Sequence, residues 1–224
     1  MISIPGTVAE ANLIQKQLLE KLKFDSEFEL SLINTFAAID VSYIPDKNLQ
    51  IAGIVLFSFP DMKIIEKKSA VSEISFPYVP GYLCFREGPG IFKVMKKLTT
   101  MPDLLMVDGH GIAHPRRLGI ATYLGIVSGI PSIGVAKKKL IGEYQVPGVQ
   151  KGSFSWLKHK EETIGVVYRS RSNVKPIFIS PGYKIELNKS LEFIRLTIGK
   201  YRLPIPIREA HNFVTQERIK ILRG

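Results

Sequence analysis

The order of β-rich segments along the chain constrains its fold more than any other feature. Three such segments, at about residues 36–43, 50–57 and 63–72, follow one another with only short turn-like sequences between them. Consecutive strands with short connections pair in antiparallel fashion, so these segments predict a meander. A helix is expected before them, because Thr7 and Glu10 have the spacing of a capping box.

After about residue 76 the pattern changes to helices that alternate with short apolar strands. Helices are expected at about 89–98, 118–128, 188–196 and 206–221, and strands at 104–107, 132–135, 163–168 and 176–179. This order favours parallel pairing. A meander followed by such units predicts an α/β fold, in which one mixed sheet is covered by helices on both faces. No repeat, low-complexity tract or linker divides the sequence, so residues 1–224 are interpreted as one domain.

Composition indicates a folded protein outside the membrane. Hydrophobic residues make up 45% of the 224-residue sequence, which supports a substantial core. No apolar run of about 18 residues exists to span a bilayer, and residues 1–6 lack the basic and apolar stretches of a signal peptide. Cys84 is the single cysteine, which excludes an internal disulfide and a zinc site of several cysteines. We expect a cytoplasmic protein in which Cys84 is buried.

Charge is divided unequally between the two halves of the sequence. Residues 1–112 contain 11 Lys and Arg against 13 Asp and Glu, whereas residues 113–224 contain 20 against 7. A basic second half is what a surface facing phosphates needs. The alternative is a solvated basic face without a partner, and composition alone does not separate the two.

Two acids interrupt or end apolar strands. Asp40 lies between apolar neighbours in the segment 36–43, and Asp108 follows the apolar run 104–107. A buried, isolated carboxylate is costly, so each needs a partner, a proton or a metal. Asp108 is also expected at the carboxyl end of a parallel strand, where open α/β sheets place their sites. Either acid alone is compatible with a satisfied structural carboxylate.

Glu87 completes an all-oxygen set with Asp40 and Asp108. Taken alone, it is interpreted as a carboxylate ahead of a helix N-terminus, favoured by the helix dipole. Three carboxylates together suit Mg²⁺, which prefers oxygen ligands and engages substrate phosphate. The sequence shows no zinc pattern, nucleotide-binding glycine loop or nucleophile-elbow serine, so no nucleotide cofactor is expected. The chemistry that remains is metal-assisted phosphodiester hydrolysis.

Several sequence blocks in a fixed order resemble the endonuclease V family and cover nearly the whole chain. They are residues 38–43, 77–81 with 85–87, 107–111 with 113–116, and 133–138, followed by 179–183 and 208–211. The resemblance implies a ribonuclease H-like fold and a DNA repair enzyme. It implies cleavage at the second phosphodiester bond on the 3′ side of deoxyinosine, leaving 3′-hydroxyl and 5′-phosphate ends. Asp40, Glu87 and Asp108 would hold Mg²⁺, with Mn²⁺ as a substitute.

The same resemblance assigns a wedge to the segment Pro77-Tyr78-Val79-Pro80, in which Tyr78 fills the gap left by an extruded base. Prolines stiffen a loop, and an aromatic ring replaces base stacking worth about 1 to 3 kcal/mol. The alternative is a Pro-rich turn with Tyr78 packed on the core.

A pocket for the extruded base is expected where glycines leave backbone groups accessible. Its expected members are Gly81, Leu83, Gly109, Gly111, Ile120 and Leu140. For each glycine the alternative is a tight turn that needs positive φ.

Further candidates lie beside these motifs. His114 is expected to position or protonate near the scissile phosphate, and Lys137 to supply positive charge there. His211 is a third candidate, with a structural role as the alternative. Asp103 is interpreted either as support for the metal site or as a turn residue.

Other functions remain open at this point. The leading expectation is a monomer that acts on DNA containing deoxyinosine and on other deaminated bases. An inosine-directed ribonuclease on the same fold is the first alternative, since no residue obviously reads a 2′-hydroxyl. A non-catalytic nucleic-acid binding protein and a ribonuclease H-like nuclease of another specificity are the others.

Overall fold

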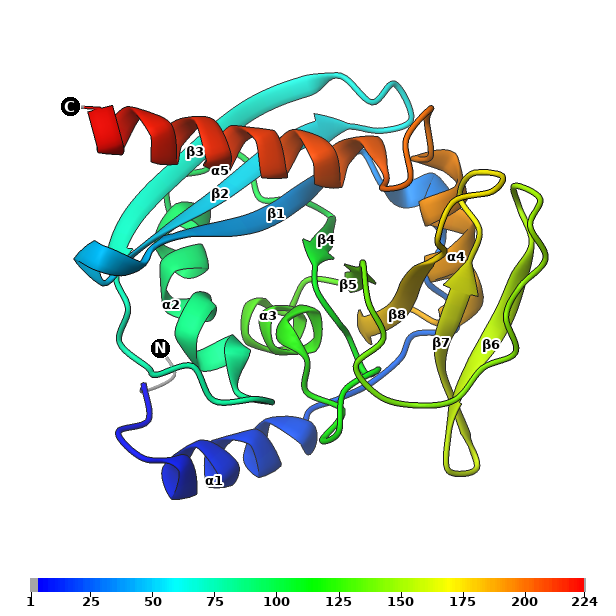
Figure 1. The fold of residues 1–224 in the computed structure, drawn as a ribbon, viewed down its shortest axis with the longest axis horizontal. Helices are drawn as coiled ribbons and strands as arrows, with labels where there is room; N and C mark the ends of the chain where they lie inside the picture. Colours follow the sequence, from blue (N-terminus) through cyan, green and yellow to red (C-terminus); the bar gives the residue numbers. More distant parts are fainter. Residues whose placement is uncertain (1–3, 224) are drawn as a thin grey trace.

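The computed structural model describes residues 4–223, which form an eight-stranded sheet with helices on both sides (Figure 1). Residues 1–3 and 224 lie outside the described part, and with them the first half of the segment 1–6, which was predicted not to be a signal peptide. The strands are β1 (Thr35–Ile44), β2 (Leu49–Ser58), β3 (Ile64–Glu73), β4 (Leu104–Asp108), β5 (Ser132–Ala136), β6 (Phe154–His159), β7 (Glu162–Tyr168) and β8 (Ile177–Tyr183). The helices are α1 (Val8–Leu19), α2 (Leu83–Met95), α3 (Ile120–Ser128), α4 (Leu187–Leu196) and α5 (Ile205–Arg223).

The strand order is β3-β2-β1-β4-β5-β8-β7-β6. β1, β4 and β5 run parallel to one another, and β2 and β3 extend the sheet as the antiparallel meander expected from the sequence. The predicted mixed sheet is confirmed. A second antiparallel section, formed by β8, β7 and β6 beyond β5, was not expected. β6 escaped prediction because it is an edge strand whose aromatic residues Phe154 and Trp156 are half exposed among polar neighbours.

Strand alternation divides the core between the two faces of the sheet. In β1, Ala37 and Ile39 pack with residues of α1, α2 and α3, whereas Phe36 and Ala38 pack with residues of α4 and α5. α5 crosses over β1, β2 and β3 (Figure 1). The predicted helices corresponding to α3, α4 and α5 agree with the structure to within two residues at each end. No helix within residues 4–223 is long and apolar enough to cross a membrane.

The helix expected to begin at Pro89 begins six residues earlier and includes this proline. Its apolar face is buried against the sheet, and this packing outweighs the missing N–H of Pro89. Gln50 of β2 supports the helix by donating from Nε2 to the carbonyl of Arg86 at 2.8 Å. Glu87 therefore lies inside α2, and its interpretation as a carboxylate ahead of a helix N-terminus is wrong.

Candidate metal centre

Two carboxylates stand side by side where β1 and β4 run parallel. Ile39 is paired with Val107, so the next residues along the two strands, Asp40 and Asp108, are neighbours. His211 reaches them from α5, and its Nδ1 lies 2.8 Å from Oδ2 of Asp40. One ligand atom from each of Asp40, Asp108 and His211 lies within 4.8 Å of the other two. Three elements distant in sequence thus converge on one cluster of possible metal ligands.

The two acids repel each other in a partly buried position. Burial raises the pKa of Asp40 above its ordinary value and the charge of Asp108 raises it further, while hydrogen bonds from His211 and from the Val41 amide lower it. Lys137 offsets part of the negative charge, because its Nζ lies 2.7 Å from Oδ2 of Asp108. A divalent cation between the acids would relieve the remaining repulsion.

Glu87 approaches Asp40 and Asp108 from the opposite face of the sheet. By strand alternation Asp40 continues the row of β1 that faces α5, whereas Glu87 is carried by α2 on the other face. Burial raises the pKa of Glu87 to about 8, and the charges of Asp40 and Asp108 contribute to the rise. Glu87 is not among the three residues whose ligand atoms lie within 4.8 Å of one another, but it is close enough for its charge to interact with Asp40 and Asp108.

Tyr43, which was not among the site residues predicted from the sequence, orients Glu87. The phenol of Tyr43 donates to Oε1 of Glu87 at 2.6 Å, and the guanidinium of Arg86 lies 5.0 Å from the Tyr43 ring centroid. Burial, followed by the charge of Glu87, raises the pKa of Tyr43 and keeps the phenol protonated. Its position near Asp40 in the same strand was the available signal, but a tyrosine in a β-strand is usually explained by packing alone.

The segment expected to act as a wedge is accessible. Tyr78 is 71% exposed, which excludes the alternative that its ring packs on the core. Pro77 and Pro80 are exposed on either side of it, and Val79 anchors the segment by packing against the buried cluster beneath α2.

Two glycines of the expected base pocket, Gly109 and Gly111, are required by close packing rather than by turn conformation. Neither Gly109 nor Gly111 has positive φ, so the tight-turn alternative does not apply to them. A Cβ on Gly109 would lie 2.4 Å from Cγ2 of Ile120, and one on Gly111 would lie 2.1 Å from the Pro181 carbonyl oxygen. Gly81 does have positive φ, at +84°. Leu140 is 47% exposed, whereas Ile120 is buried, and Leu83 opens α2 in a partly exposed position.

His114 and Asp103, two further residues predicted from the sequence, lie in different surroundings. His114 is buried, and burial followed by the nearby Arg116 charge lowers its pKa to about 4, so its imidazole is neutral at pH 7. Asp103 accepts hydrogen bonds from the backbone amides of Asn34 and Thr35 at 2.9 Å each, at the start of β1. Asp103 therefore holds the start of β1, at the end of β4 opposite to Asp108.

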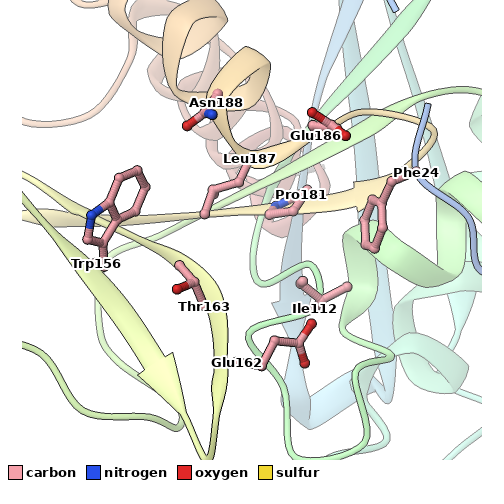
Figure 2. Close-up of a pocket in the computed structure, with 9 residues that line it drawn as sticks. All are labelled: Phe24, Ile112, Trp156, Glu162, Thr163, Pro181, Glu186, Leu187 and Asn188. Atoms are coloured by element: carbon pink, nitrogen blue, oxygen red, sulfur yellow. The ribbon is translucent and has the colours of Figure 1, made fainter. Parts of the chain in front are cut away.

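A cavity of about 410 Å³ lies elsewhere, between the N-terminus of α4 and strands β6 and β7 (Figure 2). Phe24, Trp156, Glu162 and Leu187 are among the residues that line it. None of the residues that the sequence analysis selected as site candidates lines this cavity.

Comparison with known proteins identifies the family. A family model described as Endonuclease V matches residues 16–212. The chain belongs to the endonuclease V family. Endonuclease V of Dictyoglomus turgidum is 46% identical over 199 residues, which cover 88% of this chain and 85% of the relative. Endonuclease V of Rippkaea orientalis is 41% identical over 215 residues, covering 96% and 93% of the two chains.

Solved endonuclease V structures share the fold. The crystal structure of endonuclease V from Streptomyces avermitilis has a TM-score of 0.93 and 32% identity, covering 98% of this chain and 96% of that one. Ciona intestinalis endonuclease V, crystallised with a 23mer DNA containing an inosine followed by a ribo-adenosine, has a TM-score of 0.85 and 30% identity, covering 96% and 98%. The predicted α/β architecture is thus that of endonuclease V, and family membership makes this protein a nuclease.

Proposed function

We propose that this endonuclease V family member is a DNA repair enzyme that nicks DNA at the second phosphodiester bond on the 3′ side of deoxyinosine. The products would be 3′-hydroxyl and 5′-phosphate ends. The observation that carries the proposal is the cluster of Asp40, Asp108 and His211 within 4.8 Å. The Ciona intestinalis relative, crystallised with inosine-containing DNA, supports the choice of substrate.

The donor set fits a hard divalent cation. Asp40 and Asp108 offer adjacent carboxylate oxygens, with Glu87 as a third acid nearby, and oxygen ligands are those that Mg²⁺ and Mn²⁺ prefer. Raised pKa values at Asp40 and Glu87 indicate that their charges lack sufficient compensation within the protein. When bound, Mg²⁺ would activate water for attack on phosphorus and neutralise the scissile phosphate. His211 would hold Asp40 in its ligating orientation.

The remaining side chains have roles that follow from their positions. Lys137 would place a positive charge beside Asp108, facing the phosphate. Tyr43 would hold Glu87 in one orientation. His114 would position the DNA strand near the scissile phosphate rather than donate a proton, since a pKa of about 4 leaves its imidazole neutral.

Recognition of the base is proposed to occur at two neighbouring loops. The exposed ring of Tyr78 would enter the stack in place of the extruded base. The backbone around Gly109 and Gly111 would contact that base, with Gly81, Leu83, Ile120 and Leu140 around it. The acting unit is proposed to be a monomer.

An inosine-directed ribonuclease is the second candidate. It is favoured by the ribo-adenosine that follows the inosine in the DNA bound to the Ciona intestinalis relative. A non-catalytic binding protein is disfavoured, because that reading requires the loss of a metal carboxylate and Asp40, Glu87 and Asp108 are all present.

The deciding experiment is cleavage of an end-labelled duplex with one deoxyinosine, in Mg²⁺ or in chelator, with the nick mapped to the nucleotide. A duplex with adenine at the same position is the control, and single-stranded RNA with one inosine is the competitor. A metal-dependent nick at the second phosphodiester bond 3′ to the lesion supports the proposal. If only the RNA is cleaved, the substrate is inosine-containing RNA. If neither nucleic acid is cleaved, the result favours the non-catalytic binding protein.

A further inference from the structure

Helix α1 is tied to the Tyr78 loop by a buried polar side chain. Gln15 is only 1% exposed, although a glutamine on a surface helix normally faces water. Its Nε2 donates to the carbonyl of Gly81 at 3.0 Å, and its Oε1 accepts from Nε of Arg116 at 2.5 Å. One amide group therefore connects the helix to two loops that are far apart in sequence.

Gly81 is the point at which these connections meet. Its carbonyl accepts a second hydrogen bond, from Nη2 of Arg116 at 2.7 Å, so donors from α1 and from the other loop hold the same oxygen. The backbone of Gly81 has φ of +84°, and a Cβ there would lie 2.5 Å from Nη2 of Arg116. The peptide that follows the wedge segment is thus fixed in an orientation that only glycine accepts readily.

Arg116 contacts neutral groups at this junction. Besides Gln15 and Gly81, its guanidinium lies 4.2 Å from the ring centroid of Tyr82. The Tyr82 hydroxyl donates to Oδ1 of Asn12 at 2.7 Å, which adds a second connection to α1. Hydrogen bonds to a charged group are roughly twice as strong as those between neutral groups. The junction is therefore strong enough to hold two loops in one arrangement.

The two loops carry different parts of the proposed recognition site. Gly81 ends the segment that presents Tyr78, and Arg116 follows the segment that contains Gly109 and Gly111. An exposed wedge discriminates between bases only if its distance from the base pocket is constant, because recognition depends on preorganised geometry.

We propose that Gln15 is a positioning residue for lesion recognition, which holds the Tyr78 loop in register with the Gly109–Arg116 loop through Gly81 and Arg116. The inference rests on the proposed function, since it concerns how that site selects its base. It extends the site to α1 and to a residue that precedes the region matched by the family model, residues 16–212. Gln15 itself contacts neither nucleic acid nor the metal ligands in this proposal.

Matched substitutions in α1 test it. Gln15→Met keeps the volume of the side chain and removes both hydrogen bonds, while Gln17→Met makes the same change at an exposed position of the same helix. Gln15→Glu keeps the acceptor for Arg116 and removes the donor to Gly81. We would measure kcat and KM on duplexes with deoxyinosine and with adenine. In chelator, the fluorescence of a 2-aminopurine beside the deoxyinosine would report unstacking without cleavage.

The expected result is a loss of discrimination with chemistry preserved. Gln15→Met should lower the inosine-to-adenine ratio of kcat/KM about tenfold, the change expected from losing two hydrogen bonds, and should reduce the fluorescence increase. Gln15→Glu should show a smaller loss, and Gln17→Met none. If a thermal melt shows that Gln15→Met does not fold, the comparison of Gln15→Glu with Gln17→Met decides.

Two failures are distinguishable. Wild-type protein that does not prefer inosine overturns the proposed function, whatever the variants do. If the wild-type protein prefers inosine and the folded Gln15 variants discriminate as well as Gln17→Met does, only the role of Gln15 is overturned.

Discussion

Arg202 donates a hydrogen bond from Nη2 to the backbone carbonyl of Lys137 at 2.6 Å, and the same nitrogen donates to the carbonyl of Pro176 at 2.8 Å. The guanidinium thereby joins the segment after β5 to the segment before β8. Ser170 fixes the backbone of Arg202 by donating from its hydroxyl to the Arg202 carbonyl. Because Lys137 forms the ion pair with Asp108, Arg202 holds the backbone from which that ammonium group extends.

Arg202→Ala should therefore lower kcat on deoxyinosine DNA about tenfold with little change in KM, since the ammonium group of Lys137 loses its backbone anchor. Arg202→Lys should recover only part of the loss, because an ammonium group does not reproduce the planar fork of arginine. Arg171→Ala removes the same charge from an exposed position and is the control. Equal effects of Arg202→Ala and Arg171→Ala, confined to KM, would show that Arg202 acts only as a surface charge.

Asp108→Ala and Asp40→Ala should each reduce cleavage in Mg²⁺ by on the order of 10³-fold, because a metal ion contributes several kcal/mol of charge stabilisation in the transition state. Binding of deoxyinosine DNA should be largely spared, which a gel-shift measurement in chelator would check. Asp103→Ala is the matched control, since that carboxylate supports the start of β1. Near-normal turnover of either variant would rule out the proposed metal site.

Tyr78→Ala should weaken the preference for deoxyinosine over adenine by roughly 10-fold, within the range expected from losing about 1 to 3 kcal/mol of stacking. The melting temperature should not change, because the ring is 71% exposed. Tyr78→Phe keeps the ring and should keep the preference. Competition between inosine and adenine duplexes in one reaction measures the ratio directly, and an unchanged ratio in Tyr78→Ala would remove the wedge assignment.

Metal-free protein should lose stability as pH rises from about 4.5 to about 8, because the fold raises the pKa of Glu87 from 4.5 to about 8. The folded state holds the proton of Glu87 more tightly than the unfolded state does. The stabilisation is therefore complete below the pKa of the unfolded state and is lost as the pH rises through the pKa of the folded state. Glu87→Gln should flatten this slope. Thermal melts from pH 5 to pH 9 in chelator would measure the melting temperature of the wild-type protein and of Glu87→Gln. Equal dependence of melting temperature on pH in the two proteins would contradict the role of Glu87.

Gly111→Ala should destabilise the protein by about 1 to 3 kcal/mol, the usual cost of overpacking, because the new methyl group would meet the Pro181 carbonyl oxygen. Gly6→Ala places the same group in open surroundings, where the nearest contact is 3.5 Å away, and should be tolerated. Urea titration of both variants compares their free energies of unfolding.

The sequence was sufficient for the strands with strong apolar patterns and for the acids within them. Asp40 and Asp108 were recognisable because a charge in an apolar strand needs an explanation, and parallel pairing of β1 with β4 then places them together. His211 was harder to place, since it depends on where α5 crosses the sheet, a tertiary fact without a local signal. The start of α2 was misjudged because Pro89 usually opens a helix, whereas burial of the helix face decided its extent here.

The residues that support the site through hydrogen bonds could not be predicted from the sequence for the same reason. Tyr43, Gln15 and Arg202 are ordinary residues in the sequence, and each acquires its role from partners that folding brings close. Glycine was predicted to matter at residues 109 and 111, and only the tight-turn alternative was wrong, because Ile120 of α3 and Pro181 of β8 approach these positions closely while their φ angles are not positive.

The position of α5 determines when the cluster of Asp40, Asp108 and His211 becomes complete. This helix follows every strand in sequence, covers the face of the sheet that contains Phe36 and Ala38, and brings His211 to an aspartate 171 residues earlier. During synthesis the strands and both acids therefore exist before the imidazole arrives. The docking of α5 that shields this side of the core from water is also the step that brings His211 to Asp40, so detachment of the helix would expose apolar surface and separate the imidazole from the carboxylate at the same time.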